Sequence, residues 1–181
     1  DIENRLLGHI LGATTVDRVV LLAFDQYHTE QGDPIVFRGK RDTLGTDYYV
    51  SNTYIHSLWR RYPQRILFGA SIHPYRHLDD MTATDMLAEV AGAGAVLIKW
   101  LPQTQNINVE DPRSLNFMRA ACRLGLPFLM HYGPELALGH SHREYVDPAG
   151  LLRALRLLRK EGEMPTVIIA HAATPSFWPV G

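Results

Sequence analysis

The sequence predicts an α/β fold: a partial (β/α)8 barrel in which parallel strands alternate with helices. First, five short apolar runs alternate with helical patterns, which favours a parallel sheet with right-handed crossovers. Second, every run leads into a polar residue, and these residues are Asp25, His73, Lys99, His131 and His171. Third, the chain has 181 residues, whereas a complete barrel takes about 250. An open doubly wound sheet suits this length too, but it needs no polar residue at each strand end.

The first half of the chain contains two expected helices and two expected strands. Apolar residues at helical spacing predict a helix within residues 1–15. Arg18–Asp25 follows as a buried strand that ends in a carboxylate. A serine or asparagine caps the next helix, over residues 52–61. Ile66–Ile72 is then a strand that leads into His73.

The next elements begin with a short helix over residues 84–91, which has a threonine cap. Val96–Ile98 is a strand that runs into Lys99. An aspartate-proline pair starts the following helix, over residues 112–124, and a glycine ends it. These signals all point to the same alternation of strand and helix.

The last part of the chain repeats the pattern. Leu126–Met130 is an uncharged apolar run, typical of a strand buried on both faces, and it stops at His131. A second aspartate-proline pair starts a helix over residues 148–160. The final strand, Val167–Ala170, runs into His171. Polar residues at the carboxyl ends of parallel strands lie where α/β folds place their chemistry.

Three polar segments without periodicity are expected to be loops: Gln26–Thr46, Gln103–Glu110 and Leu136–Val146. A loop of roughly 20 residues is unusual in a compact domain and is often functional. We expect His28, in the first loop, to be solvated.

Composition limits the classes of function. The chain is 46% hydrophobic and 20% charged with a formal net charge of -1, which describes one globular domain over residues 1–181. No basic cluster indicates nucleic-acid binding, and no apolar run is long enough to span a membrane. The single cysteine, Cys122, forms no internal disulfide, so a reducing cytoplasm is the expected location. A small-molecule substrate is expected, and a homo-oligomer is compatible with this composition.

The three histidines and the lysine at successive strand ends suggest a metal site. Zinc binds neutral histidine nitrogens and keeps one position open for water when the site is catalytic. The bound water ionises near neutral pH and becomes a nucleophile. Ligands on different strands of a barrel converge at one rim, so these residues could share a site.

Four segments resemble the amidohydrolase superfamily, and especially its amidohydrolase-2 branch of metal-dependent hydrolases. They are Ala70–Arg76, Ile98–Pro102, His131–Glu135 and Ala170–Thr174. The resemblance implies a TIM barrel that binds a divalent metal, zinc above all. It implies that His131 is the fifth-strand metal ligand and that His171, on the sixth strand, is a ligand and catalytic residue.

The same resemblance makes Lys99 the fourth-strand lysine, which two-metal members carbamylate. We expect Lys99 to point into the barrel mouth within reach of His131 or His171, and to be unmodified in this chain; a salt bridge to a loop carboxylate is the alternative. The residues expected to contact the substrate are His73, Trp100 and Glu135.

The sequence departs from the family pattern in two places. No His-x-His pair precedes Asp25, and the one such pair, His140–His142, lies in a loop. No strand-eight aspartate follows His171. We therefore expect the chain to represent barrel strands two to six of a longer protein, and to bind metal weakly alone.

The function expected from these residues is hydrolysis of an amide, ester or lactone by metal-activated water. A metal-dependent decarboxylase of the same superfamily is the nearest alternative. A non-catalytic barrel or an inactive fragment is the alternative from another class.

Overall fold

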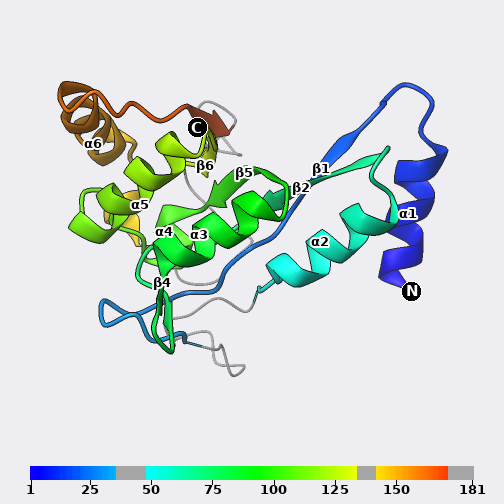
Figure 1. The fold of residues 1–181 in the computed structure, drawn as a ribbon, viewed down its shortest axis with the longest axis horizontal. Helices are drawn as coiled ribbons and strands as arrows, with labels where there is room; N and C mark the ends of the chain where they lie inside the picture. The colour runs from blue at the N-terminus through cyan, green and yellow to red at the C-terminus, as the bar shows by residue number, and fades with distance from the viewer. Residues whose placement is uncertain (36–47, 134–141, 171–181) are drawn as a thin grey trace, which may run out of the picture.

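A curved sheet of five parallel strands forms the centre of the molecule (Figure 1). The computed structural model describes residues 1–35, 48–133 and 142–170. The strand order is β1–β2–β5–β6–β7. The strands are β1 (Val19–Leu22), β2 (Ile66–Ala70), β5 (Ala95–Trp100), β6 (Phe128–His131) and β7 (Val167–Ala170). This half-barrel confirms the predicted fold class.

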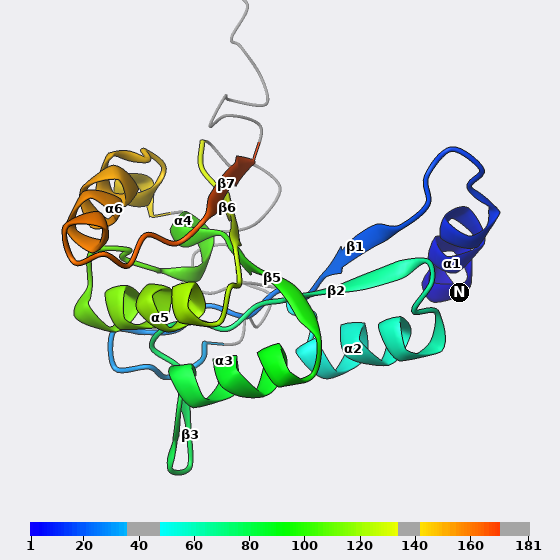
Figure 2. The ribbon, with the colours of Figure 1, turned by 45° about the horizontal axis from the view of Figure 1, so that its top comes forward.

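The helices alternate with these strands along the chain. They are α1 (Ile2–Gly12), α2 (Asn52–Arg61), α3 (Ala83–Gly92), α4 (Pro102–Gln105), α5 (Pro112–Arg123) and α6 (Ala149–Lys160). Figure 2 shows α2, α3 and α5 along one side of the sheet. None of the described helices is long and apolar enough to cross a membrane.

The two faces of the sheet differ sharply in burial. Along β2, β5 and β6, every second side chain points toward the helices. These side chains form the core and are at most 1% exposed: Ile66, Phe68, Ile98, Trp100, Phe128 and Met130. The intervening residues of the strands point to the other face, and they include Val20 and Ile168, which are 36% and 49% exposed. That face is apolar, and no described helix covers it; we call it the helix-free face. Such a face is what the interior of a barrel presents before the barrel closes.

The two aspartate-proline helix-start signals act as the sequence predicts, whereas α3 is capped by Thr82 and not by the expected Thr84. The Asp111 carboxylate accepts a hydrogen bond from the Arg113 backbone N–H at 2.8 Å, with Pro112 at the first helical position of α5. After α5, Gly125 adopts a φ of 68°, a left-handed conformation that glycine tolerates best. At α6 the Asp147 carboxylate accepts from the Ala149 N–H at 2.7 Å.

Three short elements were not predicted. A hairpin of β3 (His77–Leu78) and β4 (Met81–Thr82) projects from the body of the molecule (Figure 2). A single 3-10 turn, η1 (Arg143–Tyr145), precedes α6. The third is α4, whose residues are all buried although the sequence predicts a polar loop there. Long-range hydrogen bonds, described below, explain this burial.

Candidate functional site at the carboxyl ends of the strands

Lys99 and His131 lie on the helix-free face at neighbouring strand ends. Lys99 is paired in register with Leu129, and His131 follows two residues later on β6. Because side chains alternate along a strand, both point to the same face as Leu129. Both are half-buried, and the Lys99 Nζ donates to the Trp100 carbonyl oxygen at 3.1 Å. Lys99 therefore lies on the helix-free face; its predicted approach to His131 or His171 stays a prediction.

Trp100 points to the opposite face from Lys99. It is 0% exposed, and its ring packs against Phe117 and Phe128 with centroids 5.2 and 4.8 Å apart. Its indole N–H donates to the Ile72 carbonyl at 2.8 Å. No part of this side chain is available to a substrate. The predicted substrate contact of Trp100 therefore does not fit the structure, in which Trp100 packs in the core.

Asp25, just beyond the end of β1, is the centre of a buried polar cluster. Its carboxylate accepts hydrogen bonds from the Arg76 guanidinium at 2.7 Å, the His73 backbone N–H at 2.8 Å and the Gln26 N–H at 2.9 Å. Burial on its own raises the pKa of a carboxyl group. The neighbouring His28 ring, the Arg76 charge and the His73 amide outweigh it and hold the pKa of Asp25 below its usual value.

His73 has both ring nitrogens engaged. Nδ1 accepts from the Tyr75 backbone N–H at 3.1 Å, so Nε2 carries the proton and donates to the Gln105 carbonyl oxygen at 2.7 Å. Burial, followed by the nearby His28 ring, lowers the pKa of His73 to about 3. The ring is 0% exposed. This neutral, enclosed histidine is therefore structural, and the predicted substrate contact does not fit its position.

His28 is also buried, at 1% exposed, so the prediction of a solvated loop histidine is wrong. Its Nδ1–H donates to the Gly32 carbonyl at 2.8 Å, and its ring centroid lies 4.6 Å from that of His73. Its Nε2 lies 3.9 Å from Asp25 Oδ1. These partners, and not the polarity of the surrounding sequence, decide its burial.

Two residues that the sequence did not single out join the strand ends together. Gln105, at the end of α4, donates from its side-chain amide to the Asp25 carbonyl at 2.8 Å and accepts from the Leu101 N–H at 2.6 Å. The Ser71 hydroxyl accepts from the Asp25 N–H at 3.0 Å and donates to the Lys99 carbonyl at 2.8 Å. We call Asp25, His28, Ser71, His73, Arg76 and Gln105 the polar lock. No short-range pattern could have revealed it.

His142, the described member of the His-x-His pair, is held by other partners. Its Nε2 lies 3.1 Å from the Tyr27 hydroxyl and its Nδ1 lies 3.0 Å from Glu144 Oε1. The Tyr27 and Tyr145 rings stack on either side, with centroids 5.7 and 5.5 Å away. His142 therefore joins the segment after β1 to the segment before α6.

The described residues form no metal site by themselves. Within residues 1–35, 48–133 and 142–170, no group of three or more histidine, cysteine, aspartate or glutamate side chains is arranged to hold a metal ion. The predicted ligand and catalytic residue His171, the predicted substrate contact Glu135, and His140 lie outside the described residues. His131 is thus the one predicted ligand whose position is known.

The fold resembles solved structures, although no family model and no curated protein matches the sequence. An uncharacterized TIM-barrel protein from Bordetella bronchiseptica matches with a TM-score of 0.62 and 18% identity, over 97% of this chain and 52% of that chain. The chain thus has a TIM-barrel fold and spans about half the length of that protein.

Two weaker matches carry functional names. A probable 2-pyrone-4,6-dicarboxylic acid hydrolase from Acinetobacter baumannii has a TM-score of 0.42 and 16% identity, over 67% of this chain and 38% of that chain. A 2,6-dihydroxybenzoate decarboxylase from Rhizobium has a TM-score of 0.48 and 19% identity, over 67% and 43%. The fold assignment rests on the Bordetella protein alone.

Proposed function

We propose that this chain belongs to a metal-dependent hydrolase of the amidohydrolase type, which attacks the amide, ester or lactone carbonyl of a small molecule. The observation that supports this proposal is the placement of Lys99 and His131 on the helix-free face, at the carboxyl ends of adjacent strands. In TIM barrels this end carries the active site. The histidines of the polar lock are enclosed, which leaves His131 as the described rim histidine suited to chemistry.

The chemistry follows from these two side chains. A neutral imidazole is a common zinc ligand, and a bound divalent metal would polarise a carbonyl and supply hydroxide at neutral pH. The described residues contribute one such ligand, His131, so the ligand set is incomplete without residues outside the described ranges. Lys99 places a positive charge at the same rim, where it would stabilise negative charge that develops on a carbonyl oxygen.

Metal binding is tested by calorimetric titration of the chain with Zn2+. We expect weak binding that the His131→Ala variant loses. The matched control is His77→Ala, because His77 is exposed on the β3–β4 hairpin, and this variant should bind as the parent does. Binding that persists in His131→Ala would refute the assignment of the rim histidine as a ligand.

The reaction class is tested by analysing products after incubation with Zn2+ and candidate esters, lactones, amides and aromatic carboxylates. Incorporation of 18O from labelled water into a carboxylic acid product supports the hydrolase. Release of carbon dioxide would favour the decarboxylase instead. Zinc binding without either product would favour a non-catalytic barrel. Lys99→Met should lower a hydrolytic rate by about 100-fold without removing zinc binding.

A further inference from the structure

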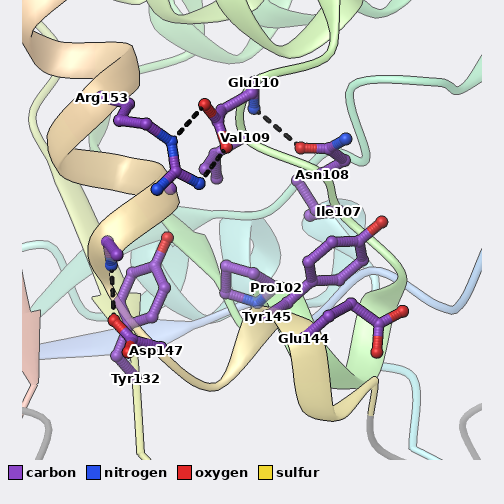
Figure 3. A pocket seen from close by; sticks show the side chains of 12 residues that line it. Pro102, Ile107, Asn108, Val109, Glu110, Tyr132, Glu144, Tyr145, Asp147 and Arg153 are labelled. Atoms are coloured by element: carbon purple, nitrogen blue, oxygen red, sulfur yellow. Dashed lines mark hydrogen bonds and ion pairs between the residues drawn. The ribbon is translucent and has the colours of Figure 1, made fainter.

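A cavity lies beside the end of β6. It has a volume of about 320 Å³ and is bordered by the segment after α4, by η1 and by the first turn of α6 (Figure 3). Cavities of roughly 300 Å³ are at the lower end of the range for small-molecule sites. Tyr132, on its border, follows His131 directly and therefore points to the other side of the strand. This cavity is thus distinct from the site proposed above.

The Tyr132 hydroxyl is an unusual group on this border. The side chain is 1% exposed, and the hydroxyl has no hydrogen-bond partner among the described residues. In Figure 3 it is directed toward the part of the cavity where Arg153 lies. Burial raises the pKa of Tyr132, so the phenol keeps its proton. A buried hydroxyl without a partner is destabilising, which a ligand that bonds to it would relieve.

The charges around the cavity favour a cation. Among the side chains that the structure describes on the border, Arg153 is the one cation, and it donates to both carboxylate oxygens of Glu110, at 2.8 and 2.6 Å. This pair is neutral as a unit, and Glu144 and Asp147 add two further carboxylates to the border, of which that of Glu144 is bonded to the His142 ring. The Tyr132 and Tyr145 rings also line the cavity, and aromatic faces attract cations. The carboxylates would repel an anion, because the Arg153 guanidinium, which could attract it, is already bonded to Glu110.

We propose that this cavity binds a small organic cation that carries a hydroxyl group. The ammonium faces the Asp147 carboxylate, which lies on the same side of the cavity as Tyr132 in Figure 3, and the hydroxyl exchanges a hydrogen bond with the Tyr132 phenol. The proposal is independent of the hydrolase assignment, because it uses neither Lys99 nor His131 and needs no metal.

Three probes of nearly equal size test the charge preference: ethanolamine, ethylene glycol and glycolate, which are cationic, neutral and anionic. Each is titrated into the 15N-labelled chain, and the amide signals of residues around the cavity are followed by NMR. Ethanolamine should give saturable shifts there and bind at least tenfold more tightly than glycolate, with ethylene glycol between them. Tighter binding of glycolate, or no saturable shift with any probe, would overturn the proposal.

Two variants test the named contacts. Tyr132→Phe removes only the hydroxyl and should weaken ethanolamine binding about three- to tenfold, the range for one hydrogen bond. Its control is Tyr54→Phe, because Tyr54 is bonded to Glu3 and does not border the cavity. The Asp147→Asn variant, which keeps a side-chain oxygen to cap α6, should bind ethanolamine and ethylene glycol equally. Unchanged binding in either variant, with an unchanged spectrum elsewhere, would refute the assigned contact and the proposal with it.

Discussion

The carboxyl ends of the strands form two regions of opposite character. At the ends of β1 and β2, the side chains of the polar lock are bonded to one another and, apart from the half-buried Arg76, are buried; His73 and His28 are 0% and 1% exposed. At the ends of β5 and β6, Lys99 and His131 are half-buried on the helix-free face. Both regions hold ionisable residues just where a strand ends, yet one is enclosed by protein and the other faces the barrel mouth.

This difference shows that position at a strand end does not define a functional residue. What distinguishes the two regions is how deeply the side chains are buried. Both nitrogens of His73 have protein partners, so a ligand would have to break hydrogen bonds to reach them. The comparison predicts that substitutions in the first region change stability and that those in the second change binding.

The largest effect on stability is expected from Asp25→Ala. The substitution leaves Arg76, the His73 amide and the Gln26 amide without their acceptor, and breaking a buried ion pair costs about 3 kcal/mol or more. The free energy of unfolding, measured by urea denaturation, should fall by that amount. The control is Glu3→Ala, which removes an exposed pair with Arg61 and should have little effect. Equal effects of the two substitutions would contradict the role of the polar lock.

A dependence of stability on pH should follow from His73. Its pKa is about 3 in the folded protein and about 6.5 when unfolded, so below pH 6.5 the unfolded state binds a proton that the folded state does not. Stability is therefore lost as the pH falls from about 6.5 toward 3, at up to about 1.4 kcal/mol per pH unit. The lowered pKa of Asp25 adds to the loss only below about pH 4.

Urea denaturation of the parent and of His73→Gln at pH 7, 6 and 5 measures this dependence. The glutamine variant is less stable at pH 7, but its stability should vary less with pH, because the buried neutral imidazole is gone. If the free energy of unfolding depends on pH equally in both proteins, a group other than His73 causes the loss of stability in acid.

A moderate loss of stability is expected from Ser71→Ala. Ser71 belongs to both regions, because its hydroxyl bonds to the backbone of Asp25 in the first and of Lys99 in the second. The substitution leaves the Asp25 N–H and the Lys99 carbonyl without the hydroxyl, and such buried groups cost about 2 kcal/mol in total. Ser57→Ala is the control, since Ser57 is exposed on α2 and should change stability by about 0.5 kcal/mol or less. If both substitutions have the same effect in thermal denaturation, Ser71 does not join the strand ends.

The smallest effects on stability are expected from Lys99→Met and His131→Gln. Both side chains are half-buried on the helix-free face, so the free energy of unfolding should change by about 1 kcal/mol or less. Zinc binding, measured in parallel, should fall in His131→Gln. A loss of stability as large as that of Asp25→Ala would show that this region is structural too.

The parts of the fold that depend on neighbouring residues could be predicted from the sequence. The start of α5 at Asp111–Pro112 and its end before Gly125 follow from local capping rules. The burial of α4 could not be predicted, because Gln105 is polar and its partner Asp25 lies 80 residues away. His28 was misjudged for the same reason, since its environment is set by His73, far along the chain.

The candidate site shows a similar division. The positions of Lys99 and His131 at strand ends could be predicted from hydrophobic runs, and the structure places both on one face. Trp100 was assigned to the same site although it is adjacent to Lys99 in β5, and adjacent side chains in a strand point to opposite faces. Alternation alone, applied to that strand, would have assigned Trp100 to the core.

The contacts of Gln105 also bear on how the protein assembles as it emerges from the ribosome. Strands β1 and β2 are complete once residue 70 has been made, and they pair directly. The hydrogen bonds of Asp25 and His73 to Gln105 can form only later, because Gln105 is synthesised 32 residues after His73. Until it arrives, the Asp25 carbonyl and the His73 Nε2–H have only water as a partner, so the nascent β1–β2 unit keeps this end hydrated. We therefore expect this end of the sheet to lose its water only after α4 has been made, because α4 supplies the last partners of Asp25 and His73.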